Sequence, residues 1–190
     1  MNLEELRRHL APAVKRFGEK RLVLEDEQIR VVESLRDRFE HSITLVSKDS
    51  EVWRPAGESV SCYEFALGLF EHSRYWEIWK AALCKIPAQG LLIEDLITAG
   101  LERLDSAREN ALVVYRSDCF GHVGRARGNK VQSKWSPGGC VWDHAPLEVP
   151  QVYGGLWGYY ASPSIDETLT IFAGEMSGTC KRALEWYHAH

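Results

Sequence analysis

Hydrophobic and polar residues follow a helical period in the first half of the chain. Apolar residues recur at three- and four-residue steps over 3–17 and 25–40, which predicts two amphipathic helices. The same spacing predicts helices from Cys62 to Phe70, from Tyr75 to Leu83 and from Leu91 to Leu104, and a short strand is predicted at Ser42–Val46. Polar residues, Pro and Gly separate these segments, as is typical of loops.

From residue 111 onward, short apolar runs bounded by turn residues predict strands. ALVVYRS (111–117) has the pattern of one strand, and HVGRARGNKVQSKWS (122–136) that of two strands joined at Gly128–Asn129. The aromatic segment 152–163 predicts a later strand, and 178–188 a closing helix. Helices followed by antiparallel strands predict an α+β fold. We expect residues 1–50 to form an N-terminal helical extension and 51–190 the α+β domain, together as one compact unit.

The length and charge of the chain favour a single globular domain and do not favour a nucleic-acid-binding protein. The chain has 190 residues, 45% hydrophobic and 26% charged, which suits one domain with a full core. A net charge of -4 does not favour a nucleic-acid partner, because phosphate binding needs a clustered basic face. The basic run 125–130 is expected to be solvated at a hairpin tip. No window has the roughly 18 apolar residues of a membrane span, so we expect no membrane partner.

The cysteines and the N-terminus suggest a compartment. Five cysteines make an odd count, and the charged N-terminus lacks the apolar region of a signal peptide. We therefore expect reduced thiols and a cytoplasmic protein rather than a disulfide framework.

Cys62 lies where one of the predicted helices begins. Ser59 or Ser61 can cap that helix, which leaves Cys62 in its first turn. The unpaired N–H groups and the dipole of a helix start favour the thiolate and lower a thiol pKa. Two interpretations are open: a nucleophile, which needs a base close in space, or a small side chain buried in the core.

His122 begins a predicted strand and is a candidate for that base. The segments run in the order SCYEFAL around Cys62, ALVVYRS at 111–117 and HVGRARGNKVQSKW at 122–135. This order resembles the NlpC/P60-like branch of the papain-like cysteine hydrolases. The resemblance covers about residues 57–135. It implies an antiparallel sheet with the nucleophile helix packed on it.

The resemblance implies a cysteine hydrolase that acts on an amide or ester, such as a peptide or peptidoglycan fragment. Cys62 would attack the carbonyl carbon, and His122 would act as general base and then as acid for the leaving group. Backbone N–H groups at the start of the helix would form part of an oxyanion hole. Water would release the thioester, so no cofactor is expected.

The third member of the site is open between two residues. Gln132 and Ser133 are the polar choices on the strand after the hairpin, and they face opposite sides of that strand. Gln132 is preferred because its amide oxygen can accept the imidazole N–H. The residues expected to line the substrate cleft are Tyr63, Lys134, Trp135 and His144, with a structural role in a loop as the alternative for His144.

A zinc site is a rival interpretation of the same histidine. Cys119 and His122, with Cys140 and His144, form a C-x2-H and C-x3-H set. Tetrahedral zinc accepts two thiolates and two imidazoles at short paired spacings. In that case Cys62 is a core thiol, and the protein is a non-catalytic binding or structural domain. A degenerate hydrolase fold used for binding is the other non-catalytic alternative.

Partners follow from the preferred interpretation. We expect a peptide-like substrate or a small amide or ester. The missing signal peptide leaves two settings open, a cytoplasmic enzyme and an effector exported without a cleavable signal. In the second setting a cognate inhibitor or immunity protein is expected.

Overall fold

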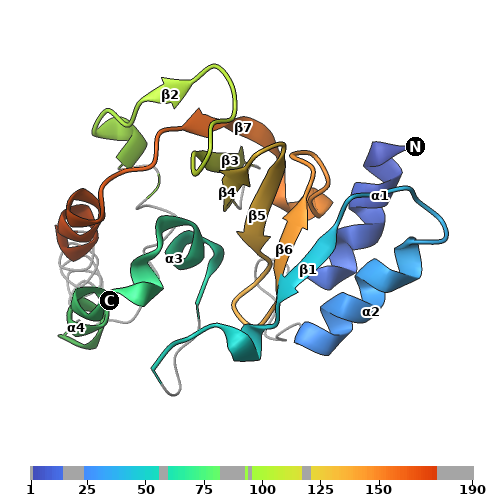
Figure 1. Cartoon of the computed structure of the whole chain (residues 1–190), viewed down its shortest axis with the longest axis horizontal. Helices are drawn as coiled ribbons and strands as arrows, with labels where there is room; N and C mark the ends of the chain where they lie inside the picture. The colour runs from blue at the N-terminus through green and yellow to red at the C-terminus, as the bar shows by residue number, and fades with distance from the viewer. Residues whose placement is uncertain are drawn as a thin grey trace, which may run out of the picture.

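A seven-stranded sheet forms the centre of the computed structural model, which describes residues 2–14, 24–55, 60–81, 93, 96–116 and 121–174. The strands lie in the order β1-β6-β5-β4-β3-β7-β2, and every neighbouring pair is antiparallel (Figure 1). The strands are β1 Thr44–Ser47, β2 Arg103–Leu104, β3 Leu112–Arg116, β4 Gly121–Arg127, β5 Lys130–Lys134, β6 Val141–His144 and β7 Gly155–Tyr160.

Helices flank this sheet on both sides. Figure 1 shows α1 and α2 on one side and α3 and α4 on the other. The α-helices are α1 Leu3–Leu10, α2 Glu25–Leu35, α3 Cys62–Leu67 and α4 Ser73–Ala81, with a further helix over 165–174. The short 3-10 turns are η1 Ala11–Ala13, η2 Asp49–Glu51, η3 Leu69–Glu71 and η4 Gln151–Tyr153.

Two hydrophobic cores form because β3 is buried on both faces. Leu112 and Val114 pack toward α3, whereas Val113 and Tyr115 pack toward α1 and α2. Successive side chains on a strand point to opposite faces, so an apolar run such as LVVY supplies both cores at once. We call them the α3-side core, which includes Cys62, Ala66, Trp76, Val114 and Val123, and the α1/α2-side core, which includes Leu6, Val32, Tyr115, Trp135 and Tyr153.

The N-terminal segment is joined to the sheet. Helices α1 and α2 supply Leu6, Leu10 and Val32 to the α1/α2-side core. Strand β1 pairs with β6, with Thr44 opposite Asp143. Residues 2–14 and 24–50 therefore contribute one edge strand and a large part of one core.

The structure confirms the mixed α+β class and the central hairpin. Strand β4 ends at Arg127 and β5 begins at Lys130, so Gly128–Asn129 forms the turn, with Gly128 at φ +58°. A glycine suits this position because L side chains rarely adopt positive φ.

Other sequence predictions differ from the structure. The helix predicted to reach Leu104 ends earlier, because Arg103 and Leu104 pair with β7 as strand β2. The helix over 165–174 was not predicted. The closing helix predicted over 178–188 lies outside the described residues.

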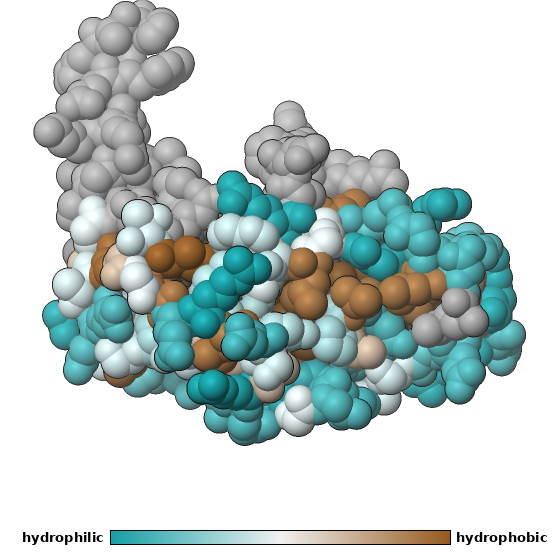
Figure 2. Space-filling view, turned by 90° about the horizontal axis from the view of Figure 1, so that it is seen from above, coloured by the Kyte–Doolittle hydropathy of each residue, from teal (hydrophilic) through white to brown (hydrophobic). Residues whose placement is uncertain are grey.

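The surface is mainly hydrophilic, with hydrophobic residues gathered in patches near the middle of the face seen from above (Figure 2). Leu45 and Val46 are exposed on β1, which is an edge strand and pairs only with β6 among the described residues. Within the described part of the chain, no helix combines the length and apolar character needed to cross a bilayer.

A buried ion cluster joins η2 to the loop that follows β5. The Lys134 ammonium is fully buried, lies 2.7 Å from Asp49 Oδ1, and also donates to the carbonyl oxygens of residues 136, 137 and 139. Arg54 donates to both Asp49 oxygens at 2.8 and 2.7 Å. Burial raises the pKa of Asp49, but the bonds and charges of Arg54 and Lys134 outweigh it and hold that pKa below its usual value.

Replacing Asp49 tests this cluster. Asp49→Asn should lower the free energy of unfolding by about 3 kcal/mol at pH 7, because it leaves the buried Lys134 charge without its counter-ion. The folded-state pKa of Asp49 is depressed, so its contribution exists at neutral pH and is lost as the pH falls through that pKa. Urea unfolding should therefore show wild type and variant converging below about pH 4.

The matched control is Glu109→Gln. Glu109 is exposed; its carboxylate bonds Arg127 at 3.2 Å and accepts from the Gly128 N–H at 2.8 Å. Glutamine keeps an acceptor oxygen there and removes only an exposed charge, so stability should change little. An Asp49→Asn variant as stable as wild type would contradict the role of the cluster.

Candidate active site

Cys62 is the first residue of α3, and the sequence encodes that start. Ser61 is the N-cap: its hydroxyl accepts from the Glu64 N–H at 3.4 Å, and the Glu64 carboxylate accepts from the Ser61 N–H at 2.5 Å. This reciprocal pair is a capping box. The buried Glu64 carboxylate also accepts from the Tyr75 hydroxyl. The predicted helix start at Cys62, with Ser61 as its cap, is confirmed.

The Cys62 thiol is buried against β4. It is 6% exposed and lies in the α3-side core with Val123. Burial raises the pKa of the thiol to about 12, although the backbone N–H groups of Val123, Tyr63 and Cys62 itself favour the thiolate. The sequence predicted a lowered pKa at this helix start. The N–H groups do act in that direction, but loss of solvation is larger, so the thiol is protonated at neutral pH.

His122 is the second residue of β4 and is buried in the opposite layer. Its ring stacks on Tyr153, with centroids 3.9 Å apart and planes 7° from parallel. The side chain is 1% exposed, and neither ring nitrogen has a hydrogen-bond partner among the described residues. Burial, together with the nearby His144, lowers the pKa of His122 well below its usual value. The imidazole is therefore neutral at pH 7.

Cys62 and His122 approach β4 from opposite faces. Val123 packs with Cys62 in the α3-side core, and adjacent residues of a strand face opposite sides. His122 accordingly points into the α1/α2-side core, toward Tyr115 and Tyr153. The structure places the thiol beside the strand that carries His122 but does not join the two side chains by a hydrogen bond.

Tyr63 lies at the same end of β4. A Cβ built on Gly121 would stand 3.2 Å from the Tyr63 hydroxyl oxygen. The start of α3 and the start of β4 therefore meet, with Tyr63, Cys62 and His122 gathered around the first residues of the strand.

Neither residue predicted to orient His122 contacts its ring nitrogens. Gln132 lies opposite Arg125 in the hairpin, and its amide N–H donates to the Asp143 carboxylate at 3.2 Å. The Ser133 hydroxyl lies 2.9 Å from His144 Nε2. Both side chains are committed to other partners, so the predicted third member is not assembled in this structure.

Ser133 belongs to a buried network with two residues predicted to line the cleft. The Trp135 Nε1–H donates to the Ser133 oxygen at 3.1 Å. His144 Nδ1 lies 2.8 Å from the carbonyl oxygen of Ala145, which can only accept, so Nδ1 carries the proton and Nε2 accepts from Ser133. Trp135 and His144 are fully buried, as is Lys134 in its ion cluster. These three residues are bonded inside the fold, and the structural alternative for His144 fits.

The zinc alternative is not supported by its described members. Cys140 directly precedes the extended strand β6 and His144 is its last residue, so their Cα atoms are about 13 Å apart at 3.3 Å per residue. This separation is too large for both side chains to reach one zinc ion through bonds of about 2.0–2.3 Å. The Cys140 thiol contacts the Glu25 carbonyl oxygen at 3.7 Å instead. Cys119 lies outside the described residues. Within them, no group of three or more His, Cys, Asp or Glu residues could hold a metal ion.

Tyr153 is the residue that sequence reasoning missed. Its ring stacks on His122, and its pKa is raised well above the usual value by burial and by the nearby Cys62. Tyr153 therefore lies close to both candidate catalytic residues. It follows His122 by 31 positions in an aromatic-rich segment, and no local spacing distinguishes it from its neighbours.

No family model matches the chain, and neither the curated proteins nor the solved structures include a significant match. The chemistry of the site therefore rests on its own geometry. That geometry offers a protonated Cys62 thiol with backbone N–H groups directed at its sulfur. It also offers the neutral imidazole of His122, next to Val123 on β4, whose nitrogens have no hydrogen-bond partner among the described residues.

Replacing the two buried histidines compares a ring that lacks hydrogen-bond partners, His122, with one that has them, His144. His122→Phe should raise the free energy of unfolding by about 1 kcal/mol, because it removes two unpartnered nitrogens and keeps a ring against Tyr153. His144→Phe should lower it by about 1–3 kcal/mol, because it breaks the bonds to Ser133 and Ala145. Urea unfolding at pH 7 measures both. Equal losses in the two variants would show that His122 has a partner in solution.

Proposed function

We propose that the chain is a cysteine hydrolase of the papain-like, NlpC/P60-like type, acting on an amide or ester of a peptide-like substrate. Cys62 is the nucleophile and His122 the general base. The observation that supports this most is the buried His122, with both ring nitrogens unpartnered, one residue from the Val123 N–H that contacts the Cys62 thiol. An unpartnered buried polar group costs about 1–3 kcal/mol, and such groups concentrate at functional sites.

The arrangement of elements also supports this assignment. A capped helix that begins with Cys62 packs against β4 and β5 of an antiparallel sheet, and His122 lies near the start of β4. The order of these segments and the packing of α3 on the sheet agree with the resemblance, whereas His122 faces the layer opposite α3.

The proposed reaction starts from two neutral groups. As the Cys62 sulfur attacks the carbonyl carbon, His122 takes the thiol proton, and the C–S bond forms while charge develops on the carbonyl oxygen. The N–H groups at the start of α3 stabilise that charge. The imidazolium then protonates the leaving amine or alcohol as its bond to the carbonyl carbon breaks. Water, deprotonated by His122, hydrolyses the thioester.

This mechanism requires His122 to leave its stack on Tyr153 when substrate binds. In the described arrangement the ring and the thiol are uncoupled, which we interpret as a resting state. Because the two side chains lie on opposite faces of β4, rotation of the His122 side chain alone does not join them, and the mechanism also requires the backbone at the start of β4 to move.

A non-catalytic binding domain built on the same fold is the second candidate. The specific observation in its favour is the burial of Cys62, which raises the pKa of the thiol to about 12, on the face of β4 opposite His122. In that case Cys62 is a core side chain.

Covalent labelling distinguishes the two candidates. A peptidyl vinyl sulfone, which requires attack by the sulfur, should label wild type at Cys62, and peptide mass mapping should locate the adduct. His122→Ala should slow labelling by at least about 100-fold, because the general base is lost. Cys140→Ser, which removes the other described buried cysteine, should label at the wild-type rate.

Labelling that appears only under unfolding conditions, at the same rate in wild type and His122→Ala, would identify Cys62 as a core thiol and favour the binding domain. Fluorescence-monitored unfolding of each variant shows whether the fold is retained.

The pH dependence of labelling tests the protonation states. The pKa of His122 lies below 6.5 and that of Cys62 near 12, so neither group titrates between pH 7 and about 10. The labelling rate should show no inflection over that range. A preformed thiolate–imidazolium pair would instead lose its imidazolium proton there, and the rate would fall. A falling limb between pH 7 and 10 would contradict the neutral resting pair.

A further inference from the structure

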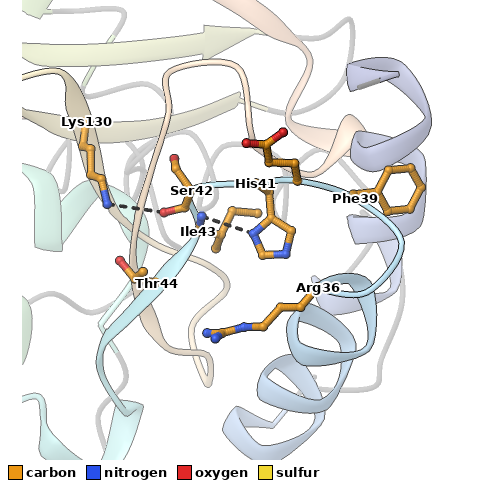
Figure 3. A pocket seen from close by; sticks show the side chains of 8 residues that line it. Arg36, Phe39, His41, Ser42, Ile43, Thr44 and Lys130 are labelled. Atoms are coloured by element: carbon orange, nitrogen blue, oxygen red, sulfur yellow. Dashed lines mark hydrogen bonds between the residues drawn. The ribbon is translucent and has the colours of Figure 1, made fainter.

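A pocket of about 420 Å³ lies where the end of α2 meets the start of β1. Residues 36 and 39–44 line it, together with Lys130 at the beginning of β5 (Figure 3). The volume is within the range of about 300–1,000 Å³ that is usual for small-molecule sites. The pocket shares no residue with the candidate active site.

Two cations lining this pocket lack acidic partners. No described residue forms a hydrogen bond or ion pair with the Arg36 guanidinium, and Lys130 donates only a long 3.4 Å bond to the Ser42 carbonyl oxygen. Of the other cations of the same hairpin, Arg125 donates to the Ala66 carbonyl oxygen and Arg127 to Glu109, and Lys134 is bonded in the ion cluster described above. In Figure 3, Arg36 extends from the α2 end beneath the His41 ring, and Lys130 approaches Ser42 from the opposite side.

His41 adds an unpartnered donor to the wall. The Ile43 N–H donates to His41 Nδ1 at 3.3 Å, so in the neutral ring the proton is on Nε2. Burial and the Arg36 charge lower the pKa of His41, against the Glu148 charge and the nearby Val32 carbonyl oxygen, which raise it. His41 Nε2 is buried and has no hydrogen-bond partner among the described residues.

The remaining lining residues indicate which chemical groups a ligand could have besides its anionic group. Phe39 and Ile43 form part of the wall, and both side chains also belong to the α1/α2-side core. The Ser42 hydroxyl already donates to Glu148, which leaves Thr44 as the small polar side chain of the lining.

Glu40 is the single acidic residue of the lining, and the Glu148 carboxylate lies behind the wall, where it accepts from the Ser42 N–H and hydroxyl. Neither carboxylate forms an ion pair with Arg36 or Lys130, so the two cations remain the available partners for an anion. An anion with an apolar portion fits this composition.

We propose that this pocket binds a small oxyanion, the carboxylate or phosphate of a ligand with an apolar portion, held between Arg36 and Lys130. Charge-assisted bonds from a guanidinium and an ammonium are the strongest that the lining offers, and carboxylate and phosphate oxygens are their natural acceptors. The proposal is independent of the hydrolase assignment.

The test titrates the full chain at low ionic strength with phenyl phosphate, benzoate and inorganic phosphate, followed by isothermal calorimetry and by amide NMR shifts. We expect millimolar or tighter binding of at least one aromatic anion, with shifts at residues 36–44 and 130. Arg36→Gln and Lys130→Gln should each weaken that binding about tenfold, equivalent to 1.4 kcal/mol. Comparing phenyl phosphate with benzoate shows which oxyanion is preferred. Comparing phenyl phosphate with inorganic phosphate measures how much the phenyl ring contributes to the affinity.

Arg127→Gln is the matched control, because it removes the same charge from the same hairpin outside the pocket. It should change the dissociation constants by less than about twofold. Equal weakening by Arg127→Gln and Lys130→Gln would show a diffuse field effect and overturn the proposal. So would the absence of binding of all three anions up to about 10 mM. Thermal unfolding verifies that the Arg36 and Lys130 variants keep the fold.

Discussion

Burial of both faces of the central strands is the constraint on which the rest of this structure depends. Because side chains alternate along β3 and β4, each strand must supply two cores, one toward α3 and one toward α1 and α2. The same alternation separates the candidate chemistry. Val123 lies with Cys62, and its neighbour His122 lies with Tyr153. Strand β4 thus carries both Val123, which contacts the thiol, and the His122 imidazole, but the two side chains face different cores.

Two-sided burial makes every polar group between the layers expensive unless it is bonded. Lys134 meets this condition through Asp49 and three carbonyl oxygens, and Ser133 meets it through Trp135 and His144. His122 does not, although it is equally buried. This contrast within one fold is the reason to propose a function for His122 rather than for the better-bonded residues around it.

The thiol illustrates a competition that decides reactivity. The start of α3 directs N–H groups at Cys62, yet burial is the larger effect and raises its pKa to about 12. A nucleophile in this environment depends on a base that acts during the attack, whereas a structural thiol needs none.

The sequence by itself determined the local features: the Ser61 cap and the helix start at Cys62, the strand at 112–116, and the hairpin that turns at Gly128–Asn129. Each depends on residues a few positions apart. The tertiary structure alone decided which face of β4 packs against α3, and with it the separation of Cys62 from His122. It also decided the stacking of Tyr153, the burial of Lys134 and the placement of Arg36 and Lys130 around one pocket. Alternation along a strand is readable from the sequence, but the layer that covers each face is set by packing between segments distant in the chain.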